Sequence, residues 1–316
     1  MKINDKQDHF LISLVDEVVK LNRPAIVVLD TNLLSSFYNF VNFFLPQFEI
    51  AKVSKFQEFY EDSLNVFQLI NNGFTTYNLK KYKNNINKLT LIDFESLFNY
   101  YPDNFDNYVN ISVGQKIDIN QIRLFLSKIG YICVDMVDYC GQFSIKGDIL
   151  DIGMSVNYEM CGVRIAIDYE NITSIDRFDL SSQRKFKSTL SNLLIPPVNK
   201  VVNSDINKDL FLDSFCKYFK DSSEIYNIIK NEMSVFNFDY FTKFIYKQIS
   251  LFDLFDQNSI FILPAKFEFL VNKIWDGISN EYGLISSYKK ALLPSDCYVD
   301  REIILSQLSK FEKIIY

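Results

Sequence analysis

Short runs of alternating apolar and polar residues fill the segment from 142 to 178, and they constrain the fold more than any other feature. One run, VRIAIDY at 163–169, places every second residue on one side. Alternation with a period of two is typical of strands with one buried face. Between the runs stand glycines: residues 141–184 hold four of the chain's nine, at positions that suit turns and bulges. The pattern predicts an antiparallel meander of four or five strands.

Segments on either side of the meander have a different pattern. PAIVVLD (24–30) is a short apolar, β-branched run, which is typical of a buried parallel strand. Three similar strand candidates are FEIAKV, LTLID and SIFIL. Helical spacing of apolar residues precedes the first strand and follows it, and Asp30, Thr31 and Asn32 are the candidates for capping the second helix.

These patterns together predict an α/β fold interrupted by a small β-rich domain. DINQIRLFLSKIGY predicts a helix that leads into the meander and ends at Gly130, and Pro196-Pro197 marks where the meander region ends. We therefore divide the chain into the first half of an α/β domain (1–112), an inserted β-rich α+β domain (113–195) and the second half of the α/β domain (196–316).

The charge and cysteine content exclude several classes of protein. A net charge of −6 argues against a surface that holds DNA phosphates. The lysines and tyrosines of the 77–88 loop allow a nucleic-acid patch, but a solvated loop is favoured because nothing else in the chain is basic. Five cysteines without CxxC spacing predict reduced thiols. FYNFVNFFLPQF, the most apolar segment, is too short to cross a bilayer. We expect a cytoplasmic protein.

The sequence offers no catalytic constellation and no cofactor motif. His9 is the only histidine, which excludes Ser/His/Asp and Cys/His devices at a packed site. Neither GxxxxGK[ST] nor GxGxxG occurs. Asp148 and Asp151 are three apart in strand-like sequence, so they point to opposite faces, and we interpret both as solvated turn carboxylates. We expect this chain not to be an enzyme and to bind no cofactor or metal.

The meander resembles the inserted domain that the bacterial repair protein UvrB shares with the transcription-repair coupling factor (Mfd). The residues that carry the resemblance are GYICVDMVDYCGQFSIKGDILDIG, followed by VRIAIDYENITSIDRFDLSSQRK. SVGQKIDINQIRLFLSKIGY is similar to the coupling factor's lead-in helix, and SLFDLFDQNSIFIL is similar to one of its strands.

That resemblance implies a RecA-like or UvrB-like α/β domain whose insert binds UvrA, the ATPase that brings damage recognition to stalled RNA polymerase. UvrB carries an intact phosphate loop near its start, whereas the coupling factor has a degenerate one. We expect the counterpart of that loop around NDKQDHFLISLV, where even the glycines are missing. The chain is thus interpreted as a non-catalytic N-terminal module of the coupling factor. The alternatives are a fragment of the UvrB-type damage-verifying helicase subunit and a free-standing adaptor.

Other partners belong to parts of the family that this chain does not contain. In the coupling factor, a polymerase-binding domain and an ATP-dependent DNA translocase motor follow later, and the insert also packs against the far C-terminus. We therefore expect a piece of a longer protein or a shortened relative. Contacts with RNA polymerase, with DNA and with the C-terminal domain, as well as ATP binding, are implied for those later parts.

Five residues of the insert are candidates for contacting a partner. Arg164 matches the family's arginine in "xRIEFF", Arg184 the one in "QRS", and Phe178 the aromatic in "RxFD". Lys146 stands where the family has arginine in "FxxRGD". Arginine is favoured at interfaces because its planar fork binds carboxylates in pairs.

The fifth candidate, Arg177, departs from the family pattern. The arginine of "SIR" is Asp176 here, and Arg177 follows one place later. A shift of one residue in a strand moves a side chain to the other face. Two interpretations stay open for Arg164 and Arg184, which either contact a partner or form salt bridges at the rim of their own sheet. Phe178 is either a core residue or an interface residue.

Overall fold

The computed structural model describes residues 7–21, 23–54, 70, 88–103, 107–198, 208–220, 238–287 and 291–316. The chain divides into two compact units. Unit 1 comprises the segments Met1–Glu61, Thr75–Tyr101 and Ile249–Tyr316, and unit 2 comprises Asp62–Phe74 and Pro102–Gln248. Parallel and antiparallel sheets both occur, so the expected mixed α/β class is confirmed. The RecA-like relationship and the boundaries at 112 and 195 stay predictions.

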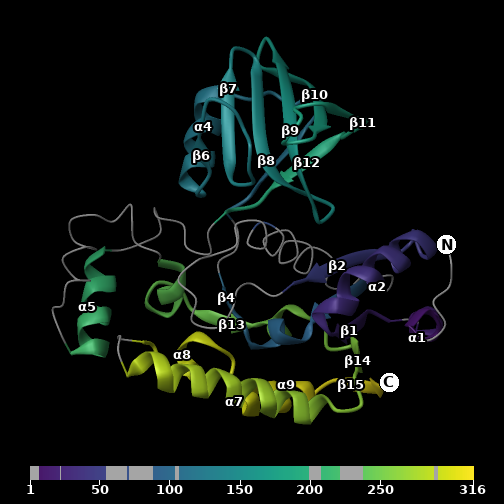
Figure 1. Ribbon diagram of the computed structural model, residues 1–316. Helices are drawn as coiled ribbons and strands as arrows, with labels where there is room; N and C mark the ends of the chain where they lie inside the picture. Colours follow the sequence, from purple (N-terminus) through teal and green to yellow (C-terminus); the bar gives the residue numbers. More distant parts are fainter. Residues whose placement is uncertain are drawn as a thin grey trace. The chain divides into compact units, whose positions relative to one another are not determined.

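Unit 1 is built on a parallel sheet of five strands in the order β15-β14-β1-β3-β2 (Figure 1). Its elements, with their bounds, are α1 (Gln7–Lys20), β1 (Ala25–Leu29), α2 (Thr31–Phe44), β2 (Glu49–Val53), β3 (Lys88–Asp93), the 3₁₀ helices η1 (Phe94–Phe98) and η5 (Leu251–Leu254), β14 (Ile260–Leu263), α7 (Phe267–Ser286), α8 (Pro294–Cys297), α9 (Arg301–Leu308) and β15 (Glu312–Ile315). Two short strands, β4 (Tyr100–Pro102) and β13 (Gln248–Ser250), lie where the chain passes between the units.

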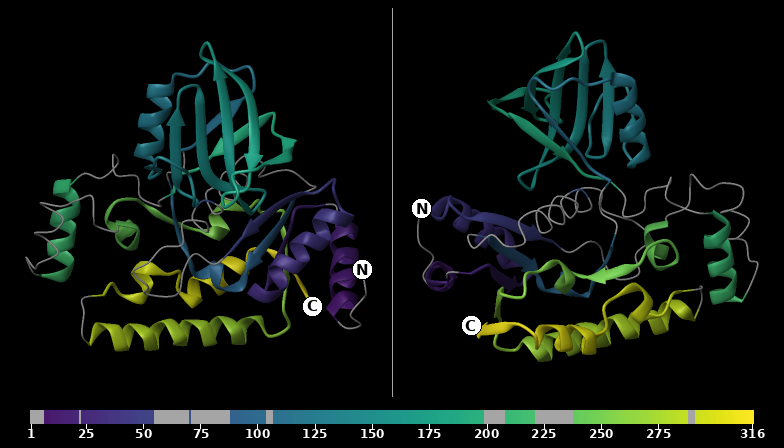
Figure 2. Two further views of the ribbon diagram at one scale, coloured as in Figure 1. Left: turned by 45° about the horizontal axis from the view of Figure 1, so that its top comes forward. Right: turned by 180° about the vertical axis from the view of Figure 1, so that it is seen from behind.

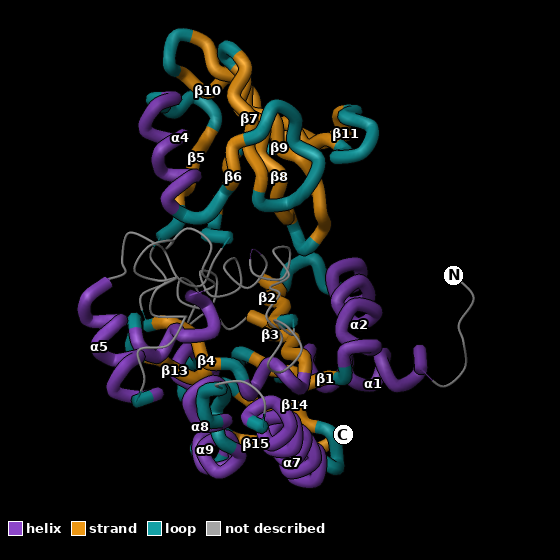
Figure 3. The backbone as a smooth tube through the Cα atoms, turned by 60° about the vertical axis from the view of Figure 1, so that its left-hand side comes forward, coloured by secondary structure: helices purple, strands orange, loops and turns teal. Residues whose placement is uncertain are grey.

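Both faces of this sheet are covered along its three central strands, β14, β1 and β3, in which every residue is buried. All five residues of β1 are buried. Amphipathic helices α1 and α2 share one core cluster with β1, and α2 contributes Leu34, Phe37 and Val41 to it. Aromatic rings gather around Phe261 of β14, with ring centroids 5.7 Å from Phe252 and 4.9 Å from Phe311. Figure 3 shows α1, α2 and α7 of this unit in purple and its strands in orange.

The junction between β1 and α2 is a single residue, Asp30. Its Oδ1 accepts a hydrogen bond of 3.0 Å from the backbone N–H of Asn32, so Asp30 is the N-cap. A phosphate loop would connect a strand to the helix that follows it, and here no loop separates the two. The expected counterpart of that loop around residues 4–15 is wrong, because its described residues begin helix α1 and β1 comes only afterwards.

Unit 2 contains the predicted meander as a six-stranded sheet in the order β11-β10-β9-β8-β7-β6. Its elements are β5 (Val109–Ser112), α4 (Ile119–Lys128), β6 (Ile132–Cys133), β7 (Gln142–Lys146), β8 (Ile149–Val156), β9 (Glu159–Asp168), β10 (Asn171–Phe178), β11 (Lys185–Thr189), β12 (Asn192–Ile195), α5 (Lys208–Phe219) and the 3₁₀ helix η4 (Phe238–Phe244). Neighbouring strands from β7 to β11 are antiparallel, while β6 joins β7 in parallel.

One face of this sheet, the inner face, forms the core of the unit. Ile152, Val163 and Ile165 point into it and are fully buried. Ile122 and Leu126 of α4 pack against the same cluster, and Figure 2 shows α4 beside the strands in both of its views. The predicted helix and meander are therefore confirmed. Two 3₁₀ helices, η1 from Phe94 and η4 from Phe238, stand where the chain makes no longer α-helix, and the second is followed by β13.

The chain enters and leaves the sheet region through one pair of strands. β5 pairs with β12 in antiparallel fashion, with Ser112 opposite Asn192 and Val109 opposite Ile195. Just after β12, the chain is held by Tyr131, whose hydroxyl donates a hydrogen bond to the carbonyl oxygen of Pro196 at 3.2 Å. Both ends of the segment 109–195 thus lie side by side.

Candidate functional site

The face of the six-stranded sheet opposite the core, which we call the outer face, holds three of the five predicted contact residues. Strand register arranges its side chains in rows that cross the sheet. One row runs through Ser144, Asp151, Arg164 and Asp176, which are direct neighbours on β7, β8, β9 and β10. Rows of this kind bring together side chains that are far apart in sequence.

Arg164 is held in the middle of this row. Its Nε donates to Asp151 Oδ1 at 2.8 Å, and a terminal nitrogen donates to Asp151 Oδ2 at 2.7 Å. The guanidinium carbon also lies 4.9 Å from the centre of the Phe178 ring, within the range of a cation–π contact. The hydrogen bonds that Arg164 donates to Asp151 raise the pKa of Arg164. Arg164 therefore forms a bidentate ion pair with a residue of its own sheet.

Asp176 closes the row on β10. Lys185 Nζ lies 2.7 Å from Asp176 Oδ2, and the Ser174 hydroxyl donates to the same oxygen at 3.0 Å. The bond from Lys185, aided by that from Ser174, lowers the pKa of Asp176. Asp176 occupies the position at which the family pattern has arginine. The positive charge beside it comes from Lys185 of the next strand.

Phe178 is fully buried although it lies on the outer face. The ring sits directly on Gly162: a Cβ added to that glycine would be 2.1 Å from Phe178 Cζ. In the same way, the backbone of Tyr139 covers Gly153, where an added Cβ would be 2.0 Å from the carbonyl oxygen of Tyr139. Phe178 and the loop that contains Tyr139 therefore cover this half of the outer face, and Phe178 is a packing residue.

The other half of the outer face is open. Its row runs through Lys146, Ile149, Ala166 and Ser174. Lys146 is exposed, and Ile149 keeps 41% of its surface accessible. Sequence reasoning missed Ile149, although its position between Asp148 and Leu150 in an alternating run signals an apolar side chain on the polar face.

Arg177 lies on the inner side of the sheet, one residue and one face away from Asp176. Its guanidinium binds Glu159 at 2.9 Å and lies 5.4 Å from the centre of the Phe186 ring. Arg184 is exposed just before β11. The structure therefore brings Lys146, Arg164 and Phe178 together on one face, but neither Arg177 nor Arg184 shares it.

The expectation that Asp151 is a solvated turn carboxylate is wrong. Asp151 lies inside β8, and its side chain is 16% exposed and bound to Arg164. Sequence spacing could not find this partner, because the pair depends on the register between β8 and β9. Asp148 does lie in an exposed turn.

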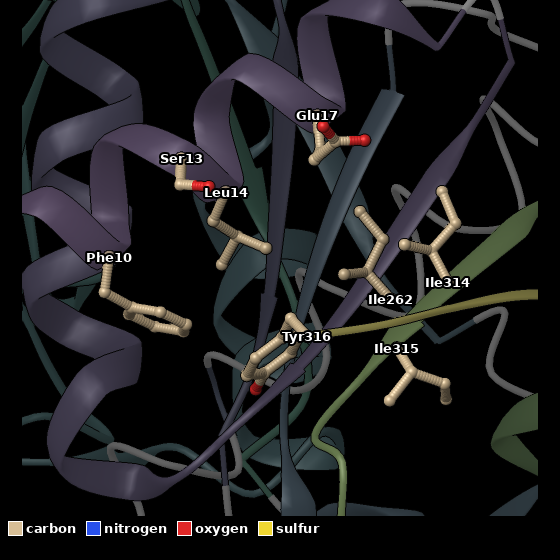
Figure 4. A pocket seen from close by; sticks show the side chains of 8 residues that line it. All are labelled: Phe10, Ser13, Leu14, Glu17, Ile262, Ile314, Ile315 and Tyr316. Carbon is tan, nitrogen blue, oxygen red and sulfur yellow. The ribbon is translucent and has the colours of Figure 1, made fainter.

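Unit 1 contains a cavity of about 460 Å³ (Figure 4). Phe10, Leu14, Ile262 and Ile314 give it an apolar lining, and its one charged lining residue, Glu17, pairs with Lys20 at 3.1 Å. Tyr316 also lines the cavity; its hydroxyl donates to the carbonyl oxygen of Val28 at 2.7 Å, and burial raises the pKa of Tyr316 to about 12. The phenol therefore stays protonated at neutral pH, and the cavity is not our candidate site. In the described part of the chain, no group of three or more potential metal ligands occurs and no helix is long and apolar enough to span a membrane. The lysine-bearing loop before Lys88 and the side chain of His9 lie outside the described residues.

Comparison with known proteins places the outer face within a recognised domain. Residues 109–200 match the family model described as the UvrB interaction domain. The UvrABC system protein B of Borreliella burgdorferi (strain ZS7) is 28% identical over 231 residues, which are 65% of this chain and 34% of that protein. That of Thermotoga maritima is 23% identical over 211 residues, 61% of this chain and 31% of that protein.

A transcription-repair-coupling factor is also similar to this chain. The protein from Haemophilus influenzae is 24% identical over 164 residues, 49% of this chain and 14% of that protein. The chain thus spans about a third of the length of the UvrABC system B proteins that it matches. The similarity is to the UvrB and coupling-factor proteins as a group and does not single out the coupling factor.

Proposed function

We propose that this chain is a non-catalytic docking module of nucleotide excision repair that binds UvrA through the outer face of its six-stranded sheet. The observation that carries the proposal is the match of residues 109–200 to the UvrB interaction domain, which coincides with that sheet. Contact should fall on the open half of the face, around Lys146 and Ile149, since Phe178 and the Tyr139 loop cover the other half.

Within this group, we propose the coupling-factor module rather than a UvrB-type helicase fragment. The support is the junction at Asp30, where the carboxylate already occupies the position at the α2 N-terminus that a phosphate would take. The second candidate, a UvrB-type fragment, is favoured by the UvrABC system B proteins among the relatives. Recruitment of UvrA to stalled RNA polymerase, in a cytoplasmic protein, would follow from the first candidate.

Calorimetric titration of the chain with UvrA tests the docking role. We choose Lys146→Glu as the test variant, because Arg164→Glu would place a third carboxylate between Asp151 and Asp176 and disturb the sheet itself. Reversing one exposed interfacial charge should weaken binding about fivefold. Lys128→Glu on α4 has the same change in charge away from the outer face and should bind like the parent.

The outcomes separate the proposals. If the parent does not bind UvrA, the docking function is wrong. If Lys146→Glu binds like the parent, docking uses a different surface. Titration with ATP in the same instrument distinguishes the two candidates, since we expect no heat of binding from the coupling-factor module and saturable binding from a UvrB-type nucleotide site.

A further inference from the structure

Strand β11 at the edge of the six-stranded sheet buries none of its residues. All five, from Lys185 to Thr189, are exposed. In the described part of the chain β11 pairs with β10 alone, so its other edge is unpaired. Figure 3 shows β11 and the turn before it standing out from the rest of the sheet. A strand ordinarily gains its stability from a buried face, and β11 has none.

The structure nevertheless holds β11 in an extended conformation. Lys185 Nζ forms an ion pair with Asp176 Oδ2 at 2.7 Å, and the ring of Phe186 lies under the guanidinium of Arg177. Before the strand, Asp179 Oδ1 accepts hydrogen bonds from Ser181 Oγ and from the backbone N–H and hydroxyl of Ser182. A segment held ready in this way loses less conformational entropy when a second strand pairs with it.

The turn that leads into β11 is fixed at a second point. Gln183 has a positive φ of 59°, and its side-chain amide donates to the carbonyl oxygens of Val137 at 3.0 Å and Leu180 at 2.8 Å. The backbone N–H of Asp179 also donates to the carbonyl oxygen of Arg184 at 2.9 Å. The start of the edge strand is therefore defined by the turn and not by burial.

The sequence at this edge is basic although the chain as a whole is acidic, so the expectation that nothing outside the 77–88 loop is basic is wrong. Residues 184–187 read Arg-Lys-Phe-Lys, whereas the whole protein carries a net charge of −6. Lys185 is paired, while Arg184 and Lys187 are exposed and form no ion pair in the described structure. Phe186 keeps 41% of its surface accessible between them. This combination repels a second copy of the same edge and attracts an acidic segment.

We propose that β11 is a docking edge for an extended acidic segment of a partner protein, which adds a strand to the sheet beside β11. Backbone hydrogen bonds to the unpaired edge would supply affinity, and Arg184 and Lys187 would select for acidic side chains. This surface is distinct from the open half of the outer face, so the proposal does not rest on UvrA binding.

The experiment uses the full chain and three synthetic peptides with blocked ends: Glu-Val-Glu-Val-Glu-Val-Glu, the same peptide with lysine in place of glutamate, and the acidic peptide with proline as its central residue. Binding is followed by fluorescence anisotropy, and amide hydrogen exchange is followed by mass spectrometry. We expect the acidic peptide to bind and to slow exchange within residues 185–189. The basic and the proline-containing peptides should bind at least about tenfold more weakly, since one is repelled and the other lacks a backbone donor.

Matched charge reversals complete the test. Arg184→Glu with Lys187→Glu should weaken the acidic peptide at least about tenfold. Arg123→Glu with Lys128→Glu on α4 changes the net charge equally and should leave binding unchanged. The proposal is overturned if the acidic peptide does not bind, if it binds without protecting residues 185–189, or if both double variants lose binding equally. Protection of β11 that rises with protein concentration without peptide would overturn it in favour of self-association.

Discussion

Asp179 shows how much of the order in this protein depends on single polar residues in turns. Its Oδ1 accepts three hydrogen bonds of 2.7 to 2.8 Å from Ser181 and Ser182, although the residue is only partly buried. Those bonds stabilise the ionised carboxylate, the largest effect coming from the Ser182 hydroxyl, and lower the pKa of Asp179 from 3.8 to about 2.

This lowered pKa predicts an acid-sensitive turn. Because the pKa is lower in the folded protein than in the unfolded chain, the carboxylate's contribution to stability is complete above about pH 4. The contribution is lost as the pH falls toward 2. Titration of the Asp179 carboxyl carbon by NMR should give a pKa near 2 in the parent and a higher value in Ser181→Ala/Ser182→Ala. An equal pKa in the two proteins would show that the serine hydroxyls do not hold the charge.

At the candidate site, Arg164 is a second residue whose role depends on one polar partner. A sequence pattern identifies the arginine but not its partner, since Asp151 lies thirteen positions away and becomes its neighbour only through strand register. The residue type alone therefore suggested a partner contact, whereas the geometry shows a bidentate pair within the sheet. Lys146 forms no ion pair in the described structure and Ile149 is exposed, so substitutions at these two positions are better tests of partner binding.

At the scale of elements, the contact of β9 with β10 depends on a glycine opposite an aromatic ring. Gly162 and Phe178 are direct neighbours across the two strands, and the ring occupies the space where a Cβ would lie. The ring in turn lies beneath the guanidinium of Arg164. Glycine is thus required at position 162 as long as Phe178 stays in place, because even a Cβ would overlap the ring.

Gly162→Ala should destabilise the sheet by about 1–3 kcal/mol, because the added methyl group displaces the ring. Phe178→Ala should cost about 3–5 kcal/mol through lost burial. The double variant should lose less stability than the sum of the two, by at least about 1 kcal/mol, because the clash is absent once the ring is removed. Urea unfolding followed by circular dichroism measures all four proteins. Simple additivity would argue against the contact between these two residues.

Sequence patterns predicted the elements that bury a complete face and missed those that do not. α4 and the strands from β7 to β10 carry clear apolar periods, because each has one stripe or face in a core, and β1 is a continuous apolar run because both of its faces are buried. β11 buries nothing and β15 buries little, so neither has a period to detect. The same limit applied to the candidate site. The family resemblance predicted the sheet that carries it. Which half of the outer face is covered could not be predicted, because that depends on where Phe178 and the Tyr139 loop pack.

At the scale of the whole molecule, each of the two units has an apolar core of its own among the described residues. One cluster contains Leu34 of α2 with its neighbours on the parallel sheet, and the other contains Leu126 of α4 with the inner face of the antiparallel sheet. The chain's one tryptophan, Trp275, belongs to α7 and hence to unit 1. Its fluorescence therefore reports on unit 1, whereas far-ultraviolet circular dichroism reports on both units.

We predict that the two cores unfold separately. Leu126→Ala should destabilise unit 2 by about 2–5 kcal/mol and shift part of the circular dichroism transition in urea, while the Trp275 transition stays where it is. Leu34→Ala, a matched truncation of a buried helical leucine in the other core, should shift the Trp275 transition. If Leu126→Ala shifts both signals together, the units unfold as one cooperative structure.

The pairing of β5 with β12 has a consequence for how such a chain can be assembled at all. A flexible loop costs more entropy to close as it lengthens, but that cost depends on the separation of the loop's ends and on their freedom. Once β5 and β12 are paired, residues 109–195 behave toward the rest of the chain as a short link rather than a long loop. A folded insert of this kind adds almost no closure entropy to its host, so a chain can carry a complete additional domain at nearly the entropic cost of a turn.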